Sequence, residues 1–220
     1  MDGYIYRPMR PLSRALARRL VPLPVAPDVF TACWFASYLG AAFAFAEGTP
    51  ASARLGAGLI LLAGFFDCLD GDLARARERP SVSGAFLEQV LHWISQASLI
   101  VGIVQGYGAQ VFPEVSPVLL TAIPLVADQM FHQVFFIING AMHPERHYGM
   151  LHRMTGTLLP LMPINSNVFW ISGLLGLPHY GLIAYTLFAA ATFICVSSIY
   201  YLWEKGYDRR VEDEHSPREE

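Results

Sequence analysis

Six long apolar stretches, separated by short turns, set the hydrophobic pattern of this chain. Their edges fall near residues 29–46, 52–72, 84–106, 112–138, 157–177 and 179–203. Each stretch is close to the roughly 20 apolar residues that a helix needs to cross a hydrocarbon core of about 30 Å. Glycine or proline punctuates the turns between them. The pattern therefore predicts an all-α integral membrane protein with six transmembrane helices.

A different pattern precedes the first apolar stretch, in residues 9–23. Leu12, Leu16 and Leu20 recur every four residues, whereas arginines occupy the other faces. This spacing is typical of a short amphipathic helix that lies in the headgroup plane of the bilayer. A solvated basic arm is the alternative. A cleaved signal peptide is disfavoured, because its charged region would be about 28 residues long.

Composition agrees with a membrane protein. The chain has 220 residues, of which 54% are hydrophobic and 15% charged, whereas soluble domains carry roughly 25% charged residues. The net charge of −3 gives no reason to expect a nucleic-acid partner. Three scattered cysteines form neither a metal motif nor an even disulfide framework, so we interpret them as packing residues.

The basic residues predict the orientation. If the N-terminus lies in the cytoplasm, all but one of the 15 Lys and Arg residues fall on the cytoplasmic side, and the exception is Arg54. Such a bias is the signature of cytoplasmic loops. We therefore expect both termini on the cytoplasmic side of the cell's inner membrane. We also expect one membrane domain over residues 1–207 and a charged, frayed tail over residues 208–220.

Acidic residues at the end of the second stretch are the first candidates for chemistry, because charges inside apolar spans are costly and mark functional sites. At 100° per residue, Asp67, Asp70, Gly71 and Ala74 share one side of a helix, and Asp72 points away. Two carboxylates on one side can bind a cation. The small Gly71 and Ala74 leave room for a large ligand to approach the backbone.

A second stripe begins the third stretch, where Gly84, Glu88 and His92 are spaced four apart. If the two helices face each other, Glu88 and His92 converge on Asp67 and Asp70. Three carboxylates and one imidazole suit a divalent-metal site, or a metal site beside a general base. A buried polar network that only holds two helices together is the alternative.

These residues together resemble the signature of the CDP-alcohol phosphotransferase family, which reads D-x-x-D-G-x-x-A-R, about eight residues, then G-x-x-x-D-x-x-x-D. The segment from Asp67 to Arg75 matches the first half at every fixed position, and Ala76–Ser83 gives the expected spacing. Pro27–Thr31 is similar to the family's P-N-x-x-T entrance, with Asp in place of Asn. The resemblance extends over the whole chain as six spans after an interfacial helix.

The resemblance implies a transferase of phospholipid biosynthesis. Its donor would be a CDP-linked alcohol such as CDP-diacylglycerol, its acceptor an alcohol, and its released product CMP. The protein would work among membrane lipids, as a homodimer. The implied metal ligands are Asp67, Asp70, Glu88 and His92, holding Mg²⁺ or Mn²⁺. The implied nucleotide-binding residues are Thr31, Asp70, Gly71, Ala74, Arg75 and Gly84.

The chain departs from the family where Glu88 and His92 replace the third and fourth aspartates. In the family the fourth aspartate is placed to deprotonate the acceptor alcohol. His92 is therefore either the catalytic general base, since a neutral imidazole is an able base near neutral pH, or a ligand that favours Mn²⁺. A CDP-lipid hydrolase and a non-catalytic nucleotide-binding homologue are the rival functions.

Secondary candidates lie in the fourth stretch and after it. Asp128 and His132 are four residues apart, and they either line an acceptor pocket or pair with each other. Arg146 and Arg153 flank a histidine-rich segment. These two arginines either bind a phosphate of the acceptor or belong to an ordinary basic cytoplasmic loop.

Overall fold

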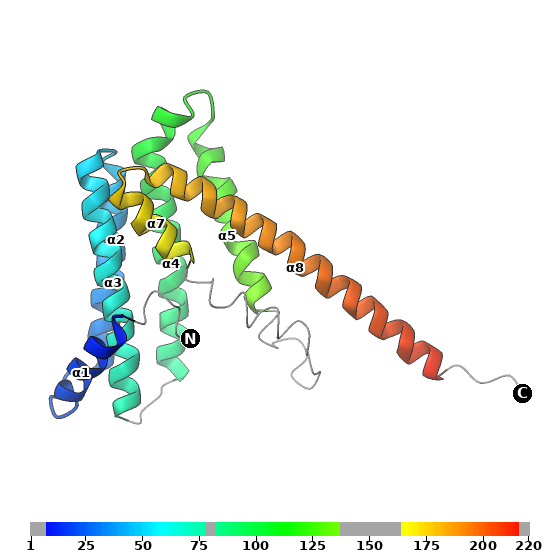
Figure 1. The fold of residues 1–220 in the computed structure, drawn as a ribbon, viewed down its shortest axis with the longest axis horizontal. Helices are drawn as coiled ribbons and strands as arrows, with labels where there is room; N and C mark the ends of the chain where they lie inside the picture. The colour runs from blue at the N-terminus through cyan, green and yellow to red at the C-terminus, as the bar shows by residue number, and fades with distance from the viewer. Residues whose placement is uncertain (1–7, 78–81, 137–163, 216–220) are drawn as a thin grey trace, which may run out of the picture.

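The computed structural model of the protein describes residues 8–77, 82–136 and 164–215, and in these ranges every regular element is a helix (Figure 1). The helices are α1 (Arg10–Leu20), α2 (Pro27–Ala46), α3 (Pro50–Ala76), α4 (Val82–Val111), α5 (Pro117–Phe136), α7 (Ile164–Leu174) and α8 (Pro178–His215). The predicted all-α class is confirmed for this part of the chain.

Proline starts four of these helices: α2, α3, α5 and α8 begin at Pro27, Pro50, Pro117 and Pro178. Proline fits the first helical position because its fixed φ suits the helix and its missing N–H would have no partner there. Thr49 adds a capping box to α3, since its hydroxyl accepts from the Ser52 amide at 3.1 Å. The chain therefore encodes the helix starts locally.

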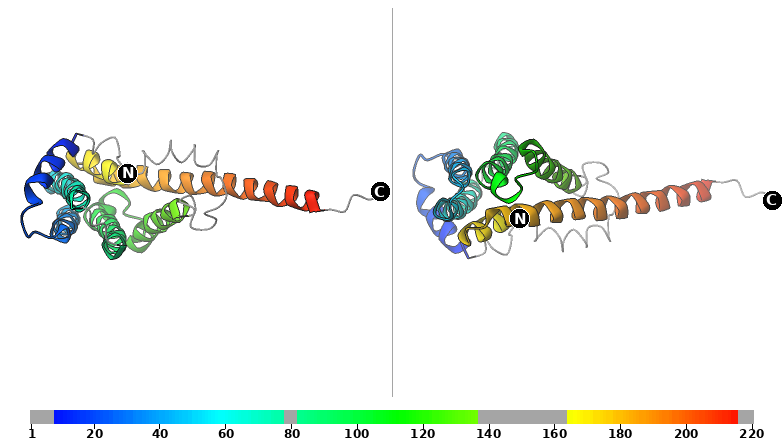
Figure 2. Two further views of the ribbon diagram at one scale, coloured as in Figure 1. Left: turned by 90° about the horizontal axis from the view of Figure 1, so that it is seen from below. Right: turned by 90° about the horizontal axis from the view of Figure 1, so that it is seen from above.

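Helix α2 is the centre of the N-terminal half, because it packs against both α3 and α4. Helix α1 contacts α3 and lies obliquely at the lower end of the bundle in Figure 1. Helix α7 packs between α3 and α8, and α5 packs on α8. Figure 2 shows α8 extending away from the other helices as a long arm.

Two glycines on α4 let it approach α2 closely. A Cβ at Gly102 would lie 2.2 Å from the carbonyl oxygen of Ala42, and one at Gly106 would lie 2.1 Å from that of Phe45. Both distances are far below van der Waals contact, so only glycine fits. Small residues four apart are a common device for close helix packing in membranes.

Four described helices are long and apolar enough to cross a membrane: Pro27–Ala46, Pro50–Ala76, Phe86–Val111 and Pro178–Ile199. These correspond to the predicted stretches 29–46, 52–72, 84–106 and 179–203. The predicted stretch 112–138 contains α5, which begins at Pro117 and has Pro124 inside it. Of the predicted stretch 157–177, residues 157–163 lie outside the described residues, and α7 accounts for Ile164–Leu174.

The structure adds detail at both ends of the described chain. Helix α1 forms inside residues 9–23, but Ser13 and Ala17 are its buried residues, whereas Leu12 stays 63% exposed. Ala17 packs with Leu69 and Leu73 of α3. At the other end, α8 continues without a break to His215. Residues 208–215, which the sequence assigned to a charged tail, therefore belong to this helix.

Candidate metal centre

Three of the predicted metal ligands meet at the junction of α3 and α4. Asp67, Glu88 and His92 each offer a ligand atom, and these atoms lie within 4.8 Å of one another. Nε2 of His92 is 3.7 Å from Oδ1 of Asp67 and 3.8 Å from Oε1 of Glu88. Both separations are longer than a hydrogen bond. Two donors of one ion at about 2.1 Å each can be up to roughly 4.2 Å apart, so this spacing suits a shared cation.

The cluster is accessible to a ligand. The side chains of Asp67, His92 and Glu88 are 29%, 41% and 48% exposed. Glu88 and His92 are one helical turn apart on α4, so the helix alone brings them together. Asp67 comes from α3, and its position depends on how α2 spaces the two helices.

Helix α2 contacts both halves of the signature. Its Thr31 hydroxyl donates to Oδ2 of Asp70 at 2.9 Å, and both residues are buried. One turn later, Trp34 packs its indole edge-on against the imidazole of His92, with ring centroids 4.4 Å apart. Trp34 is only 1% exposed, so its position is fixed by the core. The two contacts fix one residue of each half of the signature.

Asp70 lies outside the three-residue cluster, although the sequence predicted four converging ligands. One of its carboxylate oxygens is bound by Thr31, as described above, and Asp70 is only 8% exposed. Its contact with Thr31 joins two residues that the sequence assigned to nucleotide binding. The structure therefore brings Asp67, Glu88 and His92 together and places Asp70 beside α2.

The remaining nucleotide candidates lie along the same end of α3 and the start of α4. Ala74 and Gly84 are both half-buried. The guanidinium of Arg75 lies beside Gly71: a Cβ at Gly71 would be 3.2 Å from the Nη2 atom of Arg75. The space beside Gly71 that the sequence reserved for a ligand is thus shared with the Arg75 side chain.

Two contacts near the signature were not foreseen from the sequence. Asp72 points away from the cluster, as predicted, but it is buried and holds Arg10 and Ser13 of α1. Arg77 donates to main-chain carbonyls after α1, including those of Leu23 and Val25, both at 2.6 Å. The sequence shows an acidic residue and an arginine at this end of the helix, but it does not indicate which residues they contact.

The secondary candidates on α5 are adjacent. Nδ1 of His132 donates to the Asp128 carbonyl at 2.8 Å, and the Tyr185 hydroxyl of α8 donates to the Asp128 carboxylate. Asp128 is 1% exposed, so this buried acid joins α5 to α8. Arg146 and Arg153 lie outside the described residues.

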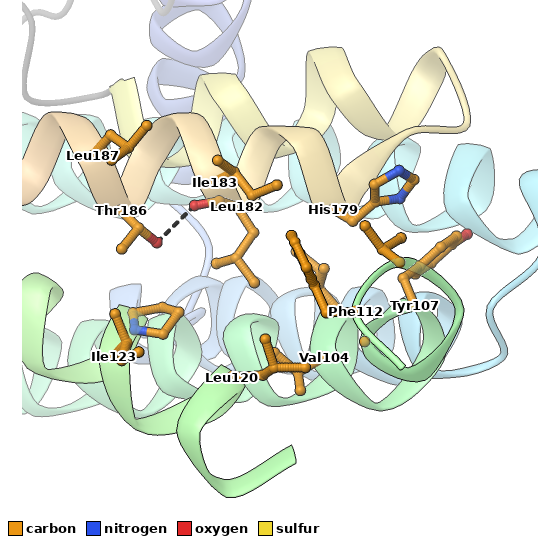
Figure 3. Close-up of a pocket in the computed structure, with 14 residues that line it drawn as sticks. Val104, Tyr107, Phe112, Leu120, Ile123, His179, Leu182, Ile183, Thr186 and Leu187 are labelled. Carbon is orange, nitrogen blue, oxygen red and sulfur yellow. Dashed lines mark hydrogen bonds between the residues drawn. The ribbon is translucent and has the colours of Figure 1, made fainter. Parts of the chain in front are cut away.

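An apolar cavity of about 190 Å³ lies elsewhere, between α4, α5 and α8 (Figure 3). Its lining includes Val104, Tyr107, Leu120 and His179, and the Thr186 hydroxyl donates to the carbonyl of Leu182 on its own helix. None of the predicted site residues that the structure describes lines this cavity. The cavity is therefore separate from the metal cluster.

Comparison with known sequences tests the resemblance directly. The sequence model of CDP-alcohol phosphatidyltransferases matches residues 24–196, which include both halves of the signature and most of the chain. The chain belongs to the CDP-alcohol phosphatidyltransferase family. Together with the four long apolar helices, this membership identifies an integral membrane protein of a transferase family.

Two curated relatives within the family are archaetidylinositol phosphate synthases. The protein from Methanothermobacter thermautotrophicus is 38% identical over 79 residues, which cover 36% of this chain and 39% of the relative. The protein from Pyrococcus horikoshii is 36% identical over 98 residues, covering 44% of this chain and 50% of the relative. The matched region thus spans half or less of each relative's length.

Solved structures of the phosphatidylinositol phosphate synthase of Mycobacterium tuberculosis share the fold. A form with CDP-DAG bound gives a TM-score of 0.57 at 19% identity, covering 84% of this chain and 92% of that one. A complex with manganese and citrate gives 0.59 at 21% identity, covering 87% and 88%. These similarities show that this chain shares the fold of that synthase.

Proposed function

We propose that the protein is a metal-dependent membrane transferase of phospholipid biosynthesis. It would move a phosphatidyl-type group from a CDP-linked lipid, such as CDP-diacylglycerol, to an alcohol, and release CMP. The observation that carries the proposal is the cluster of Asp67, Glu88 and His92 on the family's signature positions. The family match and a fold neighbour with CDP-DAG bound support the donor class.

The donor set of the cluster fits one divalent cation. Two carboxylates and one imidazole, with ligand atoms within 4.8 Å, need only small side-chain movements to share an ion. An imidazole ligand favours Mn²⁺ over Mg²⁺, and the manganese complex of the fold neighbour agrees with this preference. When bound, such an ion would neutralise phosphate oxygens of the donor.

The nucleotide would lie beside the cluster, along the cytoplasmic end of α3. Asp70, oriented by Thr31, and the exposed guanidinium of Arg75 over Gly71 would meet the cytidine diphosphate. Arginine is suited to this task because its planar fork matches phosphate oxygens. Ala74 and Gly84 would contribute small surfaces on either side.

His92 has two candidate roles, and the geometry favours that of a ligand. Its Nε2 atom faces carboxylate oxygens of Asp67 and Glu88 at nearly equal distances, as expected when all three share an ion. In the alternative role, Nε2 accepts the proton of the acceptor hydroxyl. The hydroxyl oxygen then bonds to the β-phosphorus, and the bond from that phosphorus to the CMP oxygen breaks.

The acceptor is the least constrained part of the proposal. The names of the relatives, synthases of archaetidylinositol phosphate and phosphatidylinositol phosphate, make inositol phosphate the first acceptor to test. Arg146 and Arg153 would bind its phosphate, and Asp128 and His132 would line its pocket. The same proposal includes six transmembrane helices, cytoplasmic termini and active site, and a homodimer in the inner membrane.

A transfer assay on the purified full-length protein tests the function. The protein is incubated with CDP-diacylglycerol and Mn²⁺, with and without inositol phosphate, and CMP and lipids are measured by mass spectrometry. Transfer predicts CMP and a new phospholipid only when the alcohol is present. CMP without alcohol would indicate a hydrolase, and CDP binding without any turnover would indicate a non-catalytic homologue.

A further inference from the structure

Asp72 is a buried acid inside the signature segment that the proposed chemistry does not use. Its carboxylate is 5% exposed and accepts three hydrogen bonds from charged or hydroxyl donors. Arg10 donates at 3.0 Å and Ser13 at 2.5 Å, both from α1, and Arg75 donates at 2.7 Å from one turn further along α3. A buried carboxylate with this many donors is held firmly in one place.

Through Arg75, this network reaches the side of α3 on which Gly71 lies. The Nη2 atom that donates to Asp72 is also the atom nearest to the open side of Gly71, 3.2 Å from where a Cβ would stand. On a helix, Arg75 lies between the direction of Asp72 and that of Gly71. The Arg75 side chain is 63% exposed, so its remaining N–H groups are accessible to an incoming anion.

We propose that Asp72 is a positioning residue for the donor nucleotide, acting through Arg75. It fixes one nitrogen of the guanidinium, so that the plane stays over Gly71 and the other donors face the diphosphate site. A free arginine would have to give up several rotamers on binding, and holding it beforehand lowers that cost. This inference rests on the proposed function, because it assumes that a cytidine diphosphate binds at Arg75.

A purely structural role for Asp72 makes a different prediction. If Asp72 only anchors α1, then removing either partner on α1 should have the same effect as changing Asp72 itself. Ser13 is the matched control, because Ser13→Ala removes a hydrogen bond to the same carboxylate and leaves the pair of Asp72 and Arg75 intact. The two roles therefore predict different CDP affinities: a positioning role predicts a loss for the Asp72 variant alone, whereas a purely structural role predicts equal effects for both variants.

The test measures CDP affinity by calorimetry on the full chain in detergent with Mn²⁺, together with the KM and kcat of transfer. We expect Asp72→Asn to weaken CDP binding and raise the donor KM by about tenfold, in line with the loss of a charge-assisted hydrogen bond. The value of kcat should stay within about twofold, because no group at the reacting atoms changes. Ser13→Ala should keep wild-type affinity.

A double-mutant cycle adds a second readout. In an Arg75→Gln background, Asp72→Asn should cause no further loss of affinity, because its partner is already gone. If Asp72→Asn does not fold, Asp72→Glu keeps the charge for α1 but displaces the carboxylate, and should also weaken CDP binding.

Several results would overturn the inference. Unchanged or tighter CDP binding by a folded Asp72 variant would do so, as would equal losses in Ser13→Ala or additive losses in the Arg75→Gln background. Wild-type protein that binds CDP but releases no CMP would refute the proposed function alone, since the affinity comparison still stands. Wild-type protein that binds no CDP would refute both.

Discussion

The close contact between α2 and α4 predicts a strong effect for one added methyl group. In Gly102→Ala the new Cβ would lie 2.2 Å from the Ala42 carbonyl oxygen, and its other near neighbours are also main-chain atoms. An ordinary carbon–oxygen contact is about 3.3 Å, so the helices must separate by roughly 1.1 Å. No side-chain rotation can relieve this overlap.

Overpacking of this kind costs about 1–3 kcal/mol of folding free energy. For a chain of this size, each kcal/mol lowers the melting temperature by about 2–4 °C, so we expect Gly102→Ala to melt about 2–12 °C below wild type. Gly58→Ala is the matched control, because a Cβ at Gly58 has nothing within 4 Å. That variant should melt at or slightly above the wild-type temperature, since alanine is the better helix former.

The assay is thermal unfolding of the purified variants in one detergent, followed by intrinsic fluorescence or by loss of monodisperse protein. The reasoning fails if Gly102→Ala is as stable as Gly58→Ala. In that case the two helices cannot lie as close as described. The contacts of α2 with Asp70 and His92, which depend on the same packing, would then also be in doubt.

Three further predictions concern the metal site and the topology. Asp67→Asn should abolish CMP release and weaken Mn²⁺ binding by at least about 10–100-fold, because even the loss of a residue that only contacts a metal ligand costs that much. The exposed control Asp28→Asn should change neither property, and full turnover by the Asp67 variant would contradict the metal assignment. His92→Ala should also weaken Mn²⁺ binding and be partly rescued by excess Mn²⁺, and His92→Asp should stay active and work better with Mg²⁺. A loss of roughly 10²–10⁴ in rate at unchanged Mn²⁺ affinity would instead identify His92 as the base. In a background without the natural cysteines, an impermeant thiol reagent should label Ala76→Cys only from the cytoplasmic side and Ala109→Cys only from the other; reversed labelling would refute the orientation.

The sequence predicted the helices well where local signals set their limits. Pro27, Pro50 and Pro178 each begin a helix within two residues of a predicted edge. The prediction failed where glycine served packing instead of breaking the helix. Gly106 was interpreted as the end of a span, but α4 runs on to Val111, because that glycine lies against the α2 backbone.

The candidate site was predictable only within single helices. The spacing of Glu88 and His92 follows from helical periodicity alone. By contrast, the contacts of Thr31 with Asp70 and of Trp34 with His92 depend on how α2 packs on its neighbours. The same holds for the bond from Ser13 to Asp72, which joins residues 59 positions apart. No local pattern in the chain encodes such a pairing.

Because α8 is one continuous helix, a small tilt at its start would produce a large displacement at its far end. From Pro178 to His215 it is about 56 Å long at 1.5 Å per residue, whereas Tyr185, which bonds Asp128 on α5, lies only about 10 Å from the start. A tilt of α8 about Pro178 would therefore move its far end roughly five times as far as Tyr185. A spectroscopic label near residue 215 would therefore report small movements between α5 and α8: a shift of about 2 Å at Tyr185 would appear as about 10 Å at the label.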